Sequence, residues 1–420
     1  MMPPARRPPA TAPLRLGLLW ACVACLWLAN PGRGMAARPA IDFFQGPLVN
    51  ATRVVGLGGA YVAVAEGAAG HLSNPASYAV REQSYADDWF DWDLGFTLVT
   101  MLGDSVDFDM SGAQPTLTEA RAEQLALNLK FGRFGVGMAI QSQSFSAVTT
   151  GDKSNGSSFE YDLQFGGLGM AYALSDGELV IGVTLSGSQA HLRHVETRDK
   201  HSKTVDSVYM ADSSLIDSVG VLFAPAGQRY RLGCSLRTSS ELTQAGANRD
   251  AGGELVDKEQ IAGRDTPRAV LQGSAFALGF SYVFGPRPTN ITPTYGENPK
   301  VTRSSARRYV LVSADLEILG GVDHDAVGVL GYMADEMVPS GRSTVVSVRA
   351  GVESEFLPNR LRLRGGSYFE PSRFEGSAGR LHGVAGGDVR LSLIWDWSIS
   401  AVIDVAENYY NSSLSIGFWH

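Results

Sequence analysis

The feature that most constrains this chain is a period-two alternation of large apolar residues with small or polar ones. Its clearest instance is the stretch AVLQGSAFALGFSYVFG, residues 269–285. Phe276, Leu278 and Phe280 fall on one face of an extended strand, and glycine, alanine and serine residues fall on the other. Large side chains on one face and small ones on the other are typical of the wall of a membrane β-barrel.

The same alternation recurs at residues 179–186, 229–237, 310–318, 344–355 and 388–393. In most of these segments the second face carries charges of both signs, such as Arg231, Asp315 and Arg349. The dry core of a soluble sandwich would reject such charges, whereas the inside of a barrel is normally polar. We therefore expect an all-β fold, a transmembrane antiparallel β-barrel.

The expected number of strands combines the count of candidate strands with the rule that bacterial barrels have an even number. The sequence offers about fifteen candidates, and bacterial barrels close with even numbers. We therefore expect about fourteen strands, with residues 94–100 and 325–332 as the doubtful ones. Tight turns at Gly132-Arg133 and Asp176-Gly177 should face the periplasm. Longer polar insertions should lie at the opposite end, at 143–162, 190–214, 239–267 and 286–306.

Aromatic residues gather at strand ends, as at residues 89–92, 395–397 and 409–410, which fits the girdles at membrane interfaces. The chain closes on the alternating stretch SLSIGFWH, residues 413–420. Outer-membrane proteins resemble this at their C-termini, where the barrel-assembly machinery binds the last strand. That machinery is an expected partner.

The N-terminal segment predicts the compartment. Arg6, Arg7 and Arg15 precede the apolar run 16–29, which is followed by the helix-breaking run 30–32 and small residues. This is the pattern of a secretory signal peptide, residues 1–36, cleaved after Ala36 or Ala37. An uncleaved anchor helix is disfavoured, because a span needs about 20 apolar residues.

Cysteine content and charge narrow the partners. Cys22 and Cys25 lie in the signal segment, so Cys234 alone remains and no internal disulfide is expected. The formal net charge of −8 argues against nucleic acid as a partner. Acidic loops are compatible with cation-bridged lipopolysaccharide, so outer-membrane lipid and lipopolysaccharide are the expected surroundings.

One segment, GLGGAYVAVAEGAAGHLSNPA at residues 56–76, is not barrel-like. Its glycine spacing superficially suggests a phosphate loop. Tyr61 stands where the third glycine of a dinucleotide fingerprint belongs, and a Walker lysine is missing. Nucleotide binding is therefore not predicted.

The segment instead resembles the N-terminal signature of the FadL/TodX (OMPP1) family of outer-membrane transporters of hydrophobic compounds. Its GxGGA-type stretch and its Asn-Pro-Ala motif are matched by Gly56, Gly58, Gly59, Ala60, Asn74, Pro75 and Ala76. Residues 362–372 are also similar to the RxGxxYEPS stretch of a late family strand. PorV-like relatives share the first motif.

The resemblance implies a fourteen-stranded barrel, residues 91–420, whose lumen is plugged by an N-terminal hatch, residues 37–90. It implies passive uptake of long-chain fatty acids or aromatic hydrocarbons, which bind in the lumen and leave sideways through the wall. Asn74 would hold hatch backbone groups and Pro75 a turn. The expected gate residues are Gly56, Gly58, Gly59, Asn74, Pro75 and Ala76. The opening is expected within residues 91–123, although no kink can be located there.

Arg360, Arg362 and Arg364 share one face, and with other inward arginines they are a possible lumen carboxylate-binding patch. The other arginines are Arg231, Arg237 and Arg349. The alternative, which we favour because inward polar residues are normal in barrels, is pairing with Asp315, Glu317, Glu353 and Asp388.

No catalytic residue, metal ligand or cofactor is predicted. The acidic clusters at 87–93 and 104–109 lack calcium-loop spacing, and HExxH and paired-cysteine patterns are missing. Two alternatives to transport stay open. One is a PorV-like scaffold that binds partner proteins, and the other is a lipid-modifying enzyme in which a histidine such as His71 would act.

Overall fold

The computed structural model describes residues 38–44, 48–81, 89–101, 107, 109–112, 116–151, 156–198, 201–211, 216–244, 249–250, 260–261, 264–285, 289–290, 309–322, 326–391 and 397–418. The chain divides into two compact units, Met1–Ala36 and Ala37–His420. The expected signal peptide, residues 1–36, lies outside the described residues.

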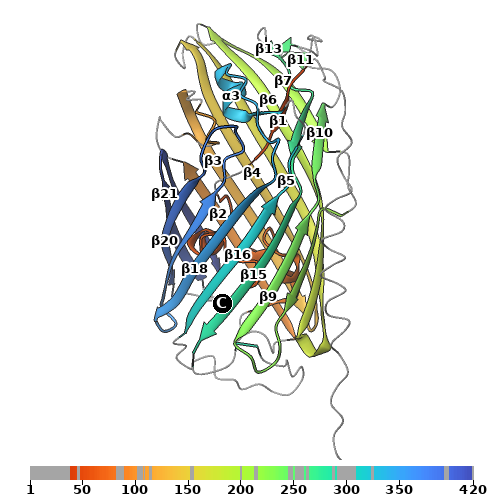
Figure 1. Cartoon of the computed structure of the whole chain (residues 1–420), viewed down its shortest axis with the longest axis vertical. Coiled ribbons are helices and arrows are strands. Elements are labelled where there is room, and N and C mark those ends of the chain that lie inside the picture. The colour runs from red at the N-terminus through yellow and green to blue at the C-terminus, as the bar shows by residue number, and fades with distance from the viewer. Residues whose placement is uncertain are drawn as a thin grey trace, which may run out of the picture. The chain divides into compact units, whose positions relative to one another are not determined.

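The unit Ala37–His420 contains a closed barrel of fourteen antiparallel wall strands (Figure 1). Closure is made by the last strand, β22 (Tyr409–Phe418), which pairs with the first wall strand, β2 (Phe90–Met101). The others are β3 (Thr116–Phe131), β4 (Phe134–Gly151), β5 (Gly156–Leu174), β6 (Leu179–Arg198), β7 (His201–Ala211) with β8 (Ser218–Phe223), β9 (Tyr230–Arg237) with β10 (Ser240–Gln244), β14 (Ala269–Gln272) with β15 (Ala275–Phe284), β16 (Val310–Leu319), β18 (Val345–Leu357), β19 (Leu361–Glu370), β20 (Arg380–Arg390) and β21 (Trp397–Ala406). The expected fold class and strand number are confirmed.

The two doubtful segments resolve differently. Residues 94–100 lie within β2, which pairs regularly with β3. Residues 325–332 are not part of the wall, because they contribute to the short strand β17 (Ala326–Gly328) and the helix α3 (Val329–Ala334). β17 pairs in parallel with β1 (Ala40–Asp42), so it cannot continue an antiparallel wall.

The remaining elements are short. They are α2 (Thr52–Gly56), η1 (Ala68–Gly70), η2 (Pro75–Ala79), η3 (Ser175–Gly177), β11 (Arg249–Asp250), β12 (Gln260–Ile261) and β13 (Arg264–Asp265). Within the described part of the chain, no helix is long and apolar enough to cross a membrane.

The connection between β15 and β16 lies at the same end as the tight turns, so the expectation for 286–306 is wrong. Phe284 pairs with Val310, and β15 pairs with β9 beside the turn that follows β8. Successive connections of an antiparallel wall alternate between its two ends. The β15–β16 connection therefore lies at the same end as the β3–β4 and β5–β6 turns. We call this the periplasmic end, since short turns of outer-membrane barrels face the periplasm.

Apolar side chains change sides part-way along the longest strands. In β5, Leu168, Met170 and Tyr172 are exposed on the outer face, whereas Phe159 and Tyr161 are buried inside the barrel. A membrane strand needs only about ten residues, and β5 has 19. The part of β5 before Gly166 therefore stands above the bilayer, where water on the outside and a closed interior reverse the preference of apolar groups. The segments 143–162 and 190–214, expected as loops, are largely such strand extensions.

The interior of this extracellular part is filled by an apolar cluster. Phe145 and Phe159 from the wall pack with Phe43, which follows β1, and with Leu330 and Tyr332 of α3. β1 itself lies between β14 and β17, parallel to both. The N-terminal strand and α3 together therefore close the extracellular end of the lumen.

Met170 tests the position of the bilayer, because its side chain is 48% exposed in the middle of the apolar outer belt. We expect Met170→Arg to destabilise the barrel in lipid vesicles by about 2–4 kcal/mol. Gln164→Arg, on the same face of the same strand but above the belt, should change the stability little. Urea titrations followed by heat-modifiable gel mobility measure both. Equal effects of the two substitutions would contradict this boundary.

Candidate functional site

Glycines of the wall strands lie in close contact with the hatch, residues 37–90 of the chain. A Cβ atom on Gly182 would lie 2.2 Å from the Pro75 oxygen, and one on Gly135 would lie 1.8 Å from the Tyr78 oxygen. Similar contacts with hatch backbone occur at Gly233 and Gly351. Hatch backbone can approach the wall this closely only where the wall has no side chain. The small inward residues seen in the sequence therefore form a socket for the hatch.

The glycines of the hatch motif serve the same contact. Gly58 and Gly59 have φ values of +60° and +76°, which residues with a Cβ rarely adopt. A Cβ on Gly58 would also lie 2.8 Å from backbone atoms of Ala350 and Ser367, in β18 and β19. Gly56 ends α2 beside the Arg364 side chain. The motif thus makes a tight turn against the wall.

Asn74 joins two parts of the hatch to the wall. Its side-chain amide donates to the Val62 oxygen at 2.8 Å and to the Val221 oxygen at 3.2 Å. Its side-chain oxygen accepts a hydrogen bond from the Ala76 backbone N–H at 3.0 Å. Pro75 is the first residue of η2, as its fixed φ favours. Asn74, Pro75 and Ala76 are all buried, so the six expected gate residues lie at hatch–wall contacts.

Buried ion pairs tie the hatch to the barrel. Arg53 in α2 pairs with Glu66 of the hatch at 3.0 Å and with Glu353 of β18 at 2.8 Å. Arg231 of β9 pairs with Glu66 at 2.7 Å. Removing one partner would leave the other charged and buried, at a cost of about 3–5 kcal/mol. This network fixes the hatch laterally.

The three arginines of the expected carboxylate-binding patch do not form one site. Arg364 is buried and pairs with Glu353 and Asp388. Arg362 is also buried on the inward face of β19, whereas Arg360 lies in the exposed turn before this strand. For Arg364, the favoured alternative, pairing with acidic residues inside the barrel, therefore holds.

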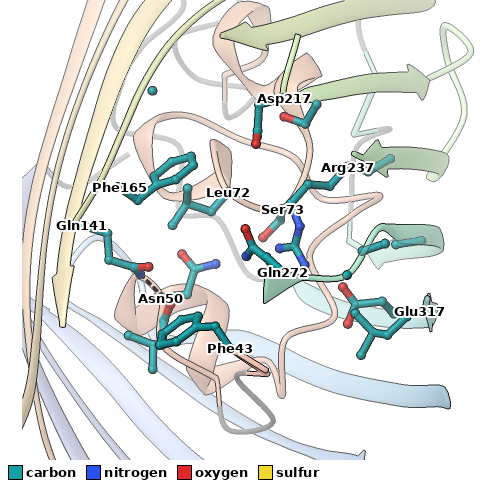
Figure 2. A pocket seen from close by; sticks show the side chains of 18 of the residues that line it. Phe43, Asn50, Leu72, Ser73, Gln141, Phe165, Asp217, Arg237, Gln272 and Glu317 are labelled. Atoms are coloured by element: carbon teal, nitrogen blue, oxygen red, sulfur yellow. Dashed lines mark hydrogen bonds between the residues drawn. The ribbon is translucent and has the colours of Figure 1, made fainter. Parts of the chain in front are cut away.

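A lumen cavity of about 180 Å³ lies between the hatch and the extracellular cluster. Figure 2 shows Phe43, Leu72 and Phe165 on one side of it. On the other side Arg237 and Gln272 point inward. A cavity of about 150 Å³ in another protein holds one benzene molecule, so this cavity has room for a single aromatic ring. The sequence pointed to Arg237 alone of these five, because the others come from separate elements without a shared motif.

A second cavity, of about 100 Å³, lies toward the periplasmic end. It is lined by Tyr61 and Glu66 of the hatch, by Asp93 and Gln124 of the first two wall strands, and by Gly417 near the end of the chain. The hatch lines both cavities.

His71, named with the enzyme alternative, has no catalytic arrangement. Its ring packs at a tilt against Tyr78, with centroids 4.1 Å apart, and among the described residues neither ring nitrogen has a side-chain hydrogen-bond partner. Burial lowers the pKa of His71 to about 3, although Asp93 opposes this shift. Among the described residues, the Ser77 hydroxyl is also without a hydrogen-bond partner. Among the described residues, no group of three or more His, Cys, Asp or Glu side chains could hold a metal ion.

The wall has an irregular place, but not where it was expected. Within residues 91–123, β2 pairs with β3 without interruption from Phe90 to Thr100, so this ladder is closed. By contrast, β6 pairs with β8 as far as Thr184 and with β7 only from Gln189. The register shifts by three residues between these two pairings, and residues 212–215, which connect β7 to β8, lie outside the described residues.

No protein-family model and no curated protein sequence matches the chain. Its structure is similar to that of the toluene transporter TbuX from Ralstonia pickettii, with a TM-score of 0.53 and 14% identity over 89% of this chain and 98% of that one. The toluene transporter TodX from P. putida gives 0.50 and 13% over 90% and 100%. The CymD monoaromatic hydrocarbon channel gives 0.50 and 10% over 88% and 96%. These likenesses confirm the fold that the sequence resemblance implied.

The socket can be tested at Gly182, whose substitution by alanine places a methyl group against Pro75. We expect Gly182→Ala to destabilise the protein by about 1–3 kcal/mol through overpacking and to raise ion conductance in planar bilayers by shifting the hatch. Gly166→Ala is the control, because open space surrounds that position. Unchanged conductance and stability in Gly182→Ala would contradict the close contact.

Asn74 allows a second test of the hatch. Asn74→Ala leaves the Val62 and Val221 oxygens and the Ala76 N–H without this partner, at about 1–3 kcal/mol for each group that stays buried and unsatisfied. We expect faster limited proteolysis of the hatch while the barrel keeps its heat-modifiable mobility. Asn74→Asp keeps the acceptor and loses both donors, so it should also loosen the hatch. Wild-type proteolysis rates in both variants would show that these bonds do not hold it.

Proposed function

We propose that this outer-membrane β-barrel takes up small hydrophobic compounds passively, binding each one in the lumen cavity and releasing it sideways into the bilayer. The observation that carries the proposal is a cavity of about 180 Å³ that is lined by the hatch and by Thr184, Ser188 and Ser218, which flank the register shift in the wall. A water-filled pore would give a greasy solute no advantage, whereas an enclosed cavity with apolar walls can remove its hydration shell.

The size of the cavity favours aromatic compounds over long-chain fatty acids. One benzene ring occupies a cavity of about 150 Å³, which leaves little room here for a long acyl chain. TbuX and TodX are toluene transporters, and CymD is a monoaromatic hydrocarbon channel. Their ligands are in keeping with a cavity of this size.

Two observations support lateral exit at the irregular place. The cavity is lined by Thr184 and Ser188 of β6 and by Ser218 of β8, which pairs with Thr184 at the edge of the register shift. On the outer face, Leu185 and Ile216 are 43% and 48% exposed, which is typical of a lipid-facing surface. A ligand leaving here crosses only the thickness of the wall. The six hatch residues described above would then act as the gate that denies the axial route.

Other assignments belong to the same proposal. The last strand, β22, is an alternating strand that closes the barrel against β2. This is the form expected of a C-terminal strand that the barrel-assembly machinery binds. The polar outer face above the belt would contact the lipopolysaccharide layer. Uptake down a gradient needs no catalytic group, so we propose no enzymatic step.

The exit can be tested by cross-linking the wall. In a Cys234→Ser background, Ser188→Cys and Ser218→Cys place thiols on β6 and β8 beside the register shift. We expect bis-maleimide cross-linkers of graded length to reduce uptake of labelled toluene, in cells with an intact lipopolysaccharide layer, to the level of cells without the protein. The cross-link would hold the two wall segments together and close the passage.

The control pair is Ser142→Cys with Gln164→Cys, which joins residues already paired between β4 and β5 and should leave uptake unchanged. Unaltered uptake after complete cross-linking of the first pair would refute exit at this place. Equal uptake of toluene by cells with and without the uncross-linked protein would refute transport of this hydrocarbon.

A further inference from the structure

The charges around the lumen cavity fall into two classes. Arg349 pairs with Glu317, and Arg373 pairs with Asp42 at 3.0 Å, so these four charges are neutralised within the protein. Arg237, which lines the same cavity, has no ion pair or hydrogen bond from its side chain among the described residues, and its buried Nε has no partner. A guanidinium has five N–H donors and is always charged, so this cation lacks protein partners.

Asp217 lies on the same cavity and is also unmatched. Its backbone N–H and C=O join β6 and the residue after β9, through Thr184 and Thr238, but its carboxylate makes no ion pair or hydrogen bond among the described residues. In Figure 2 the side chains of Asp217 and Arg237 both point into the cavity, from neighbouring parts of the wall. No ion pair joins them among the described residues, so the cavity holds one unmatched donor group and one unmatched acceptor group.

The apolar side of the cavity sets the rest of the ligand. Phe43, Leu72 and Phe165 lie on the side away from Arg237 (Figure 2). A ligand seated there would have an apolar ring against these side chains and a polar group toward Arg237 and Asp217. A pure hydrocarbon would displace water from both charges and replace it with nothing, which is costly for buried ions.

The charges that line the cavity determine which polar group a ligand can carry. Three arginines and three acidic residues line it, namely Arg237, Arg349, Arg373, Asp42, Asp217 and Glu317. A carboxylate ligand would gain Arg237 but meet the negative charge of Asp217. A hydroxyl group satisfies both, because its oxygen accepts a hydrogen bond from the guanidinium and its hydrogen donates to the carboxylate.

Resting on the proposed function, we propose that the lumen cavity is a binding site for hydroxylated monoaromatic compounds of the phenol and cresol type. Arg237 and Asp217 bind the hydroxyl group, and Phe43, Leu72 and Phe165 contact the ring. Unsubstituted aromatic hydrocarbons are then weaker ligands of this barrel, since they leave both charges unmatched.

The test compares three ligands that differ at one position of the ring: toluene, p-cresol and p-toluate. Binding to the purified full-length barrel in detergent is measured by calorimetry. We expect p-cresol to bind at least about tenfold more tightly than toluene, in line with hydrogen bonds to charged groups, and p-toluate to bind more weakly than p-cresol.

Substitutions then assign the contacts. Arg237→Gln and Asp217→Asn should each remove most of the preference for p-cresol over toluene, and the double variant should lose little more than either single one, because one hydroxyl joins the two residues. Both single variants should fold, since neither leaves a buried ion pair broken, and heat-modifiable gel mobility checks this. Arg121→Gln, at an exposed residue of β3, is the matched control and should keep the preference.

The outcomes separate this inference from the proposed function. Toluene binding equal to or tighter than p-cresol binding, unaltered by Arg237→Gln, would overturn the hydroxyl site and leave a hydrocarbon channel. Tightest binding of p-toluate, strengthened further by Asp217→Asn, would overturn it in favour of an anion site. Binding of none of the three, together with no uptake by cells, would remove both proposals.

Discussion

Every backbone N–H and C=O group within the hydrocarbon layer must be hydrogen-bonded inside the protein, because lipid offers no partner. The pairing of β22 with β2 meets this demand by leaving the sheet without an edge. Beside residues 185–188 of β6 the ladder changes register, where the outer face changes from apolar side chains to polar ones. Under the proposed function, the ligand leaves at this level, because water and lumen polar groups there can satisfy backbone groups that lipid cannot.

The seating of the hatch depends on a second constraint, the short distance between its backbone and the wall. Wall glycines such as Gly135 and Gly182 admit hatch backbone to contacts that any Cβ would prevent, and Asn74 then uses its whole side-chain amide on hatch and wall groups. Ion pairs from Arg53 add lateral fixation. A plug held by backbone contacts on small residues can move as a unit when a few bonds break, whereas one interdigitated by large side chains would have to unpack.

The sequence predicted those features that are carried by single strands. Alternation with period two revealed the barrel, parity set fourteen strands, and the glycine motif indicated the hatch. The reversal of faces in β5 was also present, since Phe159 and Tyr161 are odd-numbered and Leu168 and Met170 are even-numbered, but it was interpreted as a loop. The cavity and the wall irregularity depend on how different strands pair and end. No single segment records those relations, so they could not be inferred from one sequence.

The arginines of the lumen show why spacing alone cannot identify a ligand site. Arg362 and Arg364 were predicted as site residues from their regular spacing. Arg364, however, forms ion pairs with Glu353 and Asp388 within the protein. Arg237 has no such regular neighbours, and it faces the lumen cavity with its Nε unpartnered. A buried ion pair is already satisfied and gains nothing from a ligand, whereas an unmatched charge gains the full strength of a new hydrogen bond. The residues that select a ligand are therefore those that the internal ion pairs leave over.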